Sequence, residues 1–160
     1  QGGETRSDGA VYVPGFGFER SSTKNVRYAI DDNFFMFWFR FIYRYNYMLE
    51  IENYESVREI ISRDYETFSG LMLEKYFRRV LIETKSYTRI GGWWDRKGEN
   101  EIDIIAENEL DDTATFFEVK RKAANFSRPR LEEKAGAFLR ATGEFQGYSL
   151  TYTGLSLADM

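Results

Sequence analysis

The sequence contains no cysteine and no histidine, and only two prolines among its 160 residues. Without cysteine the chain has no disulfide framework, no thiolate zinc site and no cysteine nucleophile. Without histidine it has no Ser-His-Asp triad and no imidazole metal ligand. A metal site must therefore use oxygen ligands, which favour hard cations such as Mg²⁺, Mn²⁺ or Ca²⁺. A general acid or base must be a carboxylate, a lysine or a tyrosine.

A strong excess of charge and a membrane-length apolar run are also absent. Lysine and arginine number 22 and aspartate and glutamate 26, a net charge of −4, which disfavours a dedicated nucleic-acid binder. The most apolar stretch, 34–47, contains two arginines and is shorter than the roughly 20 residues that a spanning helix needs. Because no signal peptide is visible either, we expect a cytoplasmic protein without a membrane segment.

Aromatic side chains are abundant and concentrated in one segment. They make up 18% of the chain, and nine of them lie between Phe34 and Tyr47. Phe34, Trp38, Phe41 and Tyr45 recur at helical spacing, and neighbouring apolar residues widen this face over most of the helix circumference. The pattern predicts a helix that is buried on several sides.

The remaining pattern predicts three segments: 1–30, 31–68 and 69–160. In the first, short strands at 11–13 and 27–30 are either the arms of a hairpin or part of a mobile tail. The second is an aromatic-rich helical linker, capped near residues 31–33 and containing a helix at 54–62. The third has a helix at 69–83, strands at 87–94, 101–106 and 115–120, a helix at 131–145 and a strand at 148–152. The fold class is therefore a mixed α/β core with an N-terminal helical extension.

Three charged residues on neighbouring strands form a candidate site. Asp103 stands in the middle of an isoleucine-rich strand. Glu118 and Lys120 are two apart on the next strand, so their side chains share one face. Glu74, on the preceding helix, is a fourth candidate. Carboxylates that converge in this way can hold Mg²⁺ or Mn²⁺, and a lysine beside them can neutralise charge on a phosphate.

A plainer interpretation of the same residues remains open. Charged residues protect the edge strands of sheets, and a solvated Glu-Lys pair contributes less than about 1 kcal/mol. A basic cluster also lies beside the motif, since residues 120–140 include seven basic and two acidic side chains. It is either a phosphate-binding surface or a solvated helix face. Its candidate nucleic-acid contacts are Lys122, Arg128, Arg130 and Lys134.

Several short motifs occur in a characteristic order. They are Ser69-Gly70-Leu71-Met72-Leu73-Glu74-Lys75, Gly91-Gly92-Trp93-Trp94, Glu101-Ile102-Asp103-Ile104-Ile105-Ala106 and Phe117-Glu118-Val119-Lys120. This order resembles the PD-(D/E)xK nuclease superfamily, although Ile102 stands where the namesake motif has proline. More narrowly, the chain resembles the C-terminal domain of prokaryotic AAA+ (STAND-type) ATPases, whose aromatic junction is matched by residues 28–41.

The resemblance implies a restriction-endonuclease-like fold and a nuclease site. Asp103, Glu118 and Lys120 would be the catalytic residues, and Glu74, Asp103 and Glu118 would hold Mg²⁺ or Mn²⁺. DNA would be the substrate, and ATPase and winged-helix domains of the same polypeptide would be the partners. Residues 1–30 would then be a candidate remnant of the winged helix. Two alternatives remain: a catalytically inactive interaction or sensor module that regulates the ATPase, and a structural domain with these acids on its surface.

Overall fold

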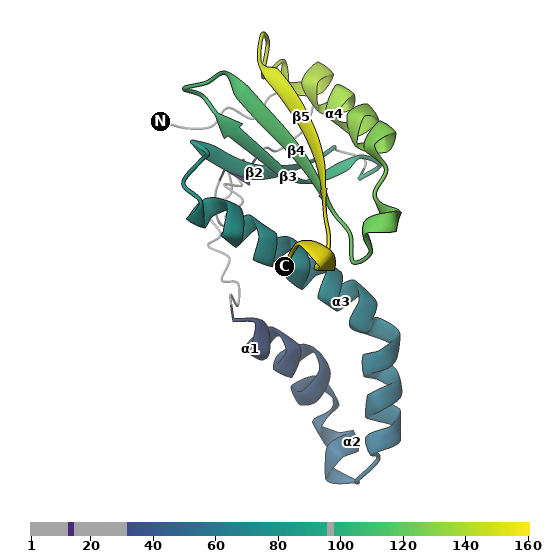
Figure 1. Cartoon of the computed structure of the whole chain (residues 1–160). Helices are drawn as coiled ribbons and strands as arrows, with labels where there is room; N and C mark the ends of the chain where they lie inside the picture. The colour runs from purple at the N-terminus through teal and green to yellow at the C-terminus, as the bar shows by residue number, and fades with distance from the viewer. Residues whose placement is uncertain (1–12, 15–31, 96–97) are drawn as a thin grey trace, which may run out of the picture. The chain divides into compact units, whose positions relative to one another are not determined.

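The computed structural model describes residues 13–14, 32–95 and 98–160 (Figure 1). The chain divides into two compact units. Among the described residues, 32–72 form a helical unit, and 73–160 with the short strand at 13–14 form an α/β unit. The division falls inside one long helix, so each unit contains part of it. No helix within these ranges is long and apolar enough to cross a membrane.

The helical unit begins with a succession of short helical segments. These are α1 (Asn33–Phe37), the π-helical turn η1 (Trp38–Ile42), the 3₁₀ turn η2 (Tyr43–Tyr45) and α2 (Asn46–Glu50). Asp32 caps α1, because its side chain accepts a hydrogen bond of 2.9 Å from the Phe35 backbone N–H. The expected start of the helix is thereby confirmed.

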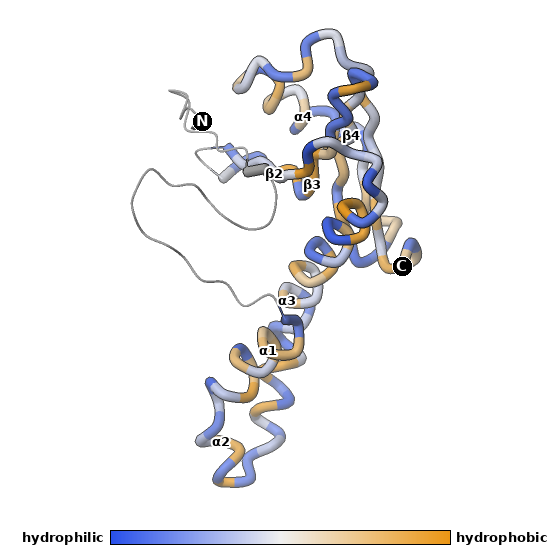
Figure 2. Tube along the Cα trace, turned by 90° about the vertical axis from the view of Figure 1, so that its left-hand side faces the viewer, coloured by the Kyte–Doolittle hydropathy of each residue, from blue (hydrophilic) through white to orange (hydrophobic). Residues whose placement is uncertain are grey.

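The prediction that the aromatic segment is buried on several sides is wrong for this chain. Phe41 is buried, and its ring packs against those of Phe37 and Phe68. Most of the other aromatic rings are exposed, and apolar residues colour much of α1 orange in Figure 2. The segment is packed on one side, through Phe41, and the π-helical turn interrupts the 3.6-residue period on which a continuous stripe depends. The exposed aromatic residues of this segment are Phe34, Phe35, Trp38, Phe39, Tyr43 and Tyr47.

The two helices predicted at 54–62 and 69–83 form one continuous helix, α3 (Tyr54–Glu83). The sequence between them contains no proline, and Gly70 alone costs a helix about 1 kcal/mol. Ser69 does not cap a new helix. Its hydroxyl instead donates to the Glu66 carbonyl within the same helix. Packing of the surrounding turns outweighs these two weak interruptions.

The α/β unit is built on a five-stranded mixed sheet in the order β1-β2-β3-β4-β5. The strands are β1 (Val13–Pro14), β2 (Arg89–Trp94), β3 (Glu101–Asn108), β4 (Thr113–Val119) and β5 (Ser149–Leu155). The first four are antiparallel neighbours, whereas β4 and β5 are parallel and are connected through α4 (Arg128–Thr142). A parallel pair requires such a crossover. The predicted α/β class and its order of helix, three strands, helix and strand are confirmed.

The boundaries of most elements in the α/β unit differ by a few residues from the sequence prediction. Helix α4 ends before Gly143, whose φ of +68° suits a left-handed cap, and not at the predicted residue 145. Strand β1 pairs with β2, with Val13 opposite Gly92. The segment 27–30, expected as the second arm of a hairpin, lies outside the described residues.

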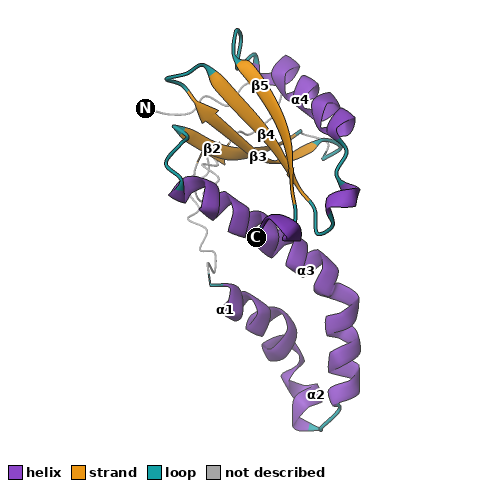
Figure 3. Ribbon diagram, viewed as in Figure 1, coloured by secondary structure: helices purple, strands orange, loops and turns teal. Residues whose placement is uncertain are grey.

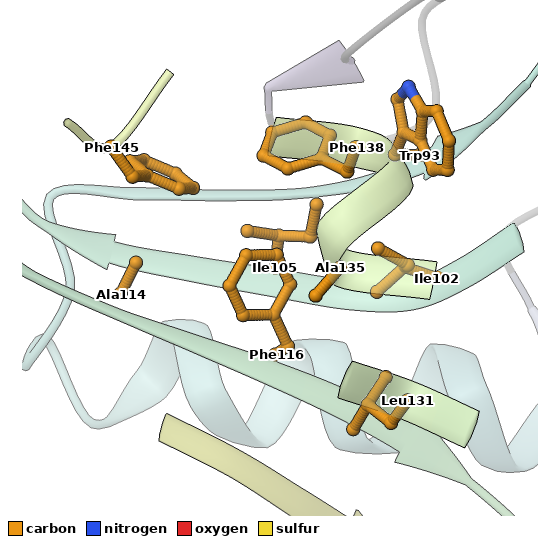
Figure 4. Packing of buried hydrophobic residues seen from close by; sticks show 9 residues of the cluster. All are labelled: Trp93, Ile102, Ile105, Ala114, Phe116, Leu131, Ala135, Phe138 and Phe145. Carbon is orange, nitrogen blue, oxygen red and sulfur yellow. The ribbon is translucent and has the colours of Figure 1, made fainter. Parts of the chain in front are cut away.

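Two hydrophobic clusters lie on the faces of the sheet. Figure 3 shows the strands of this sheet together with α3 and α4. On one face, Ile102, Ile105 and Phe116 pack against α4, as the close view in Figure 4 shows. On the other face, Ile104, Ala106 and Phe117 pack against the last turns of α3. Trp93, the first of the two adjacent tryptophans, is buried on the α4 side.

Candidate functional site

The candidate residues lie where β3 and β4 separate. The ladder between these strands ends at the pair Ile104 and Phe117, and Asp103 and Glu118 are the next residues along each strand. The Val119 N–H, which has no ladder partner on β3, donates to Asp103 Oδ2 at 2.7 Å. The carboxylate thus replaces a backbone acceptor, which fixes its position at the fork between the strands.

A bulge in β3 lies directly beside Asp103. Gly91 pairs with Ile105 but Trp93 pairs with Ile102, so β3 carries one more residue than β2 between these pairs. Arg78 Nη2 of α3 donates to the Asp103 carbonyl oxygen at 2.8 Å. A Cβ on Gly92 would lie 3.0 Å from that oxygen and 3.1 Å from Arg78 Nη2. Gly92 therefore makes room for the arginine.

Glu118 is a buried carboxylate held by two lysines. Only 6% of the residue is exposed. Its Oε1 lies 2.9 Å from Nζ of Lys134 and 3.1 Å from Nζ of Lys120. Burial alone would raise the pKa of Glu118, but the hydrogen bonds and positive charges of Lys134 and Lys120 hold that pKa below its ordinary value. Glu118 is therefore ionised and its charge is neutralised at neutral pH.

Glu74 is brought to the sheet by its neighbours on α3. Leu73 and Phe77 are buried in the cluster on this face, and Glu74 lies half-buried between them. No described residue donates a hydrogen bond to its carboxylate or forms an ion pair with it. Burial, followed by the negative charges of Asp103 and Glu101, raises the pKa of Glu74 to about 7. Burial also raises the pKa of Asp103, against the opposing effect of the Val119 N–H.

The four predicted site residues are neighbours, but they do not form a closed cage. The charge of Asp103 acts on Glu74, and the charges of Glu118 and Lys120 act on Asp103. Across 13–14, 32–95 and 98–160, no three acidic side chains converge closely enough to hold a metal ion. Glu118 interacts with Lys134 on the α4 side of the sheet, whereas Glu74 belongs to α3 on the other side.

The donors are of the type that a hard cation prefers, but they are not placed as a closed metal site. Glu74 and Asp103 are two carboxylates whose pKa values are raised by burial, and the negative charge of Asp103 raises the pKa of Glu74 further. A divalent cation relieves that kind of repulsion, and carboxylate oxygen is its preferred ligand. Glu74, Asp103 and Glu118 are the residues that would hold it.

The four predicted nucleic-acid contacts separate into different environments. Lys134 belongs to the site through its pair with Glu118. Arg128 pairs with Glu132 at 2.8 Å and lies over the Tyr152 ring. Lys122 and Arg130 are exposed.

Sequence reasoning missed Arg78 and the role of Lys134 within the site. The sequence contains one indication for each of these two residues. Arg78 is one helical turn after Glu74, and Lys134 is one turn after the buried Leu131.

Replacing Glu74 by glutamine should stabilise the protein at pH 8 and leave its stability nearly unchanged at pH 4. Because the folded-state pKa is raised to about 7, wild-type stability falls as pH rises through the range between the ordinary value and 7. The expected gain at pH 8 is about 1–2 kcal/mol, since solvent screens a half-buried group. Urea unfolding at the two pH values measures it.

The exposed Glu59 on the same helix provides a matched control. Glu59→Gln should leave the free energy of unfolding unchanged at both pH values. An equal effect of Glu74→Gln at pH 4 and pH 8 would contradict a raised pKa.

The fold and site define a mixed α/β domain with a carboxylate-lysine group at the fork of two central strands. Residues 38–134 match the family model DUF234, which is described as archaeal and bacterial proteins of unknown function. The chain therefore belongs to the DUF234 family. An uncharacterized protein of Methanocaldococcus jannaschii is 40% identical over 111 residues, which cover 65% of this chain and 24% of that protein. The chain thus spans about a quarter of this relative's length. No solved structure gives a significant match.

Proposed function

We propose that this domain hydrolyses phosphodiester bonds of DNA with Mg²⁺ or Mn²⁺, as the nuclease-like part of a larger ATPase. The observation that carries the proposal is the grouping of Asp103, Glu118 and Lys120 where β3 and β4 separate. Asp103 Oδ2 accepts from the Val119 N–H at 2.7 Å, and Glu118 pairs with Lys120 at 3.1 Å. The order of motifs that resembles the PD-(D/E)xK superfamily, together with the absence of cysteine and histidine, supports the same chemistry.

Each residue has a role in this mechanism. Glu74, Asp103 and Glu118 would supply carboxylate oxygens to the cation, which when bound lowers the pKa of a water and stabilises charge on the phosphate. Asp103 is held in place by the Val119 N–H, and its backbone is held by Arg78. Lys120 extends from the end of the strand and neutralises negative charge as it develops on a phosphate oxygen. The exposed Lys122 and Arg130 would bind the DNA backbone.

Cleavage of single- and double-stranded DNA tests the proposal. We expect the wild-type chain to cut at least one of these substrates with millimolar Mg²⁺ or Mn²⁺, and to lose this activity in EDTA. The Lys120→Met variant should lose activity under the same conditions, and Lys85→Met, an exposed lysine in the turn after α3, should retain it. Equal residual cleavage by wild type and Lys120→Met would show that the activity is a contaminant.

A second candidate function is a catalytically inactive module that regulates an ATPase through binding. The neutralisation of Glu118 by two lysines favours it, because this carboxylate is already satisfied without a metal. Isothermal titration with Mg²⁺ and Mn²⁺ separates the two functions. Absence of binding at millimolar concentration, in a folded protein, would favour the inactive module.

A further inference from the structure

Exposed aromatic side chains form a continuous surface along the helical unit, which we call the aromatic face. Ring contacts connect most of its members, with the centroids of successive rings 5.6–6.5 Å apart in the order Trp38, Phe34, Phe35, Phe39 and Tyr43. A contiguous apolar patch on a protein surface marks a site of interaction. The aromatic face consists of Phe34, Phe35, Trp38, Phe39, Tyr43 and Tyr47, which are 42–72% exposed.

The π-helical turn keeps part of the aromatic face on one side of the chain. Phe35, Phe39 and Tyr43 recur every four residues along α1 and η1. Four residues of an α-helix exceed one turn by about 40°, so a row with this spacing drifts around the helix axis. A π-helical turn contains more residues and opposes that drift. The Phe39 and Tyr43 rings therefore stay in contact across η1, with centroids 5.6 Å apart.

The helical unit has few buried apolar residues of its own. Within residues 32–72 the buried ones are Phe41, Val57 and Phe68. The rings of Phe41 and Phe68 pack together, and Phe37 contacts both of them. The two hydrophobic clusters of the sheet contain no described residue of this unit. Most of the aromatic surface of the helical unit therefore lies outside its interior.

We propose that the aromatic face binds the same face of a second copy of this chain, in a two-fold symmetric dimer. The proposal does not depend on the metal site or on catalysis. In a two-fold contact each surface meets its own copy, so a charge near the symmetry axis would lie opposite a like charge. A surface that pairs with itself must therefore be free of charge at its centre.

The aromatic face meets that requirement. Residues 33–39 contain no charged side chain. The next basic residues along the chain turn toward other rings, since Arg40 lies over the Phe41 ring and Arg44 over the Tyr45 ring. Phe41 is the ring that packs against α3, so the guanidinium group of Arg40 lies on the α3 side of the segment.

The area of the aromatic face suits a dimer. A fully buried aromatic side chain removes about 150–250 Å² from solvent. At the exposed fractions of these six residues, a covering partner would bury about 500–850 Å² of them. Stable interfaces bury about 600–1,000 Å² on each partner and are enriched in phenylalanine, tyrosine and tryptophan. The hydroxyl groups of Tyr43 and Tyr47 suit the polar rim of such an interface.

Sedimentation equilibrium of the wild type and three variants at about 1–100 µM tests the proposal. The wild type should change from monomer to dimer in this range. Phe35→Glu places a charge in the aromatic face and should weaken dimerisation by about 30-fold or more. Phe39→Ala removes one ring without adding charge and should weaken it by about tenfold. The control is Leu110→Glu, in the turn between β3 and β4, where Leu110 is 86% exposed; it should leave dimerisation unchanged.

The variants are expected to fold, because the monomer already exposes these side chains and their loss changes its stability little. Circular dichroism verifies this. Weaker association of Phe35→Glu and Phe39→Ala, with Leu110→Glu unchanged, supports the proposal. If Phe35→Glu loses helix content, the association of Phe39→Ala decides in the same way.

Three results would overturn the dimer. A wild type that stays monomeric at every concentration would mean that a different partner covers the aromatic face. Dimers that persist in both Phe35→Glu and Phe39→Ala would mean that another surface joins the two copies. Equal weakening in Phe35→Glu and Leu110→Glu would mean that net charge, and not the aromatic face, controls association.

Discussion

Under the proposed function, Asp103→Asn should reduce Mg²⁺-dependent cleavage of DNA by about 10³-fold or more, because Asp103 would be a metal ligand and such a ligand contributes several kcal/mol of transition-state stabilisation. Asparagine has the shape of aspartate, and its Oδ1 can still accept the Val119 N–H bond that is 2.7 Å long in the wild type. The substitution therefore removes the negative charge and keeps the local structure. Initial rates of cleavage on the substrate that the wild type prefers measure the loss.

The stability of this variant distinguishes a catalytic role from a structural one. Because burial raises the pKa of Asp103, the ionised carboxylate carries a cost at neutral pH that asparagine does not. Asp103→Asn should therefore unfold at the same temperature as wild type or higher. The control is Glu109→Gln, an exposed acid just beyond the end of β3, which should keep full activity. A loss of activity that accompanies unfolding would contradict a direct role for Asp103.

Phe138→Ala should destabilise the α/β unit by about 3–5 kcal/mol, the usual cost of deleting a fully buried phenylalanine ring. Phe138 is 0% exposed and lies at the centre of the cluster between the sheet and α4 (Figure 4). Its ring contacts those of Trp93, Phe116 and Phe145, with centroids 5.6–5.8 Å apart. No single neighbouring side chain can move to fill the space that the ring leaves, so a cavity remains. Urea unfolding followed by tryptophan fluorescence measures the loss.

Phe34→Ala is the matched control for this experiment. Phe34 is the same residue type but is 63% exposed on α1. Its removal should change the free energy of unfolding by no more than about 0.5 kcal/mol. Similar losses for the two variants would mean that the cluster against α4 is not the main source of stability in the unit.

The order of elements could be predicted because the hydrophobic period changes clearly along the α/β unit. Alternation marks β3 at its start, and helical spacing marks α4. Helix boundaries were harder to place. The sequence between Tyr54 and Glu83 does not indicate whether the helix is interrupted near Gly70, because the continuity of the helix depends on tertiary packing.

The site could be predicted in part for a related reason. Glu118 and Lys120 are two residues apart on one strand, so their side chains share a face, and this spacing predicts the ion pair between them. The second partner of Glu118 comes from α4, 16 residues further along the chain, and depends on how that helix packs on the sheet. The same limit applies to the buried Glu107, which accepts hydrogen bonds from Arg89 and from Tyr148. Sequence spacing alone does not indicate such long-range partners.

The bulge in β3 affects which substitutions the domain can tolerate at Asp103. Ile102 and Ile105 both pack toward α4, although a regular strand would place residues three apart on opposite faces. The extra residue lies between them, where Asp103 stands. Asp103 therefore takes no place in either hydrophobic cluster. Substitutions at this position that keep an acceptor for the Val119 N–H should therefore leave the packing on both sides of the sheet unchanged.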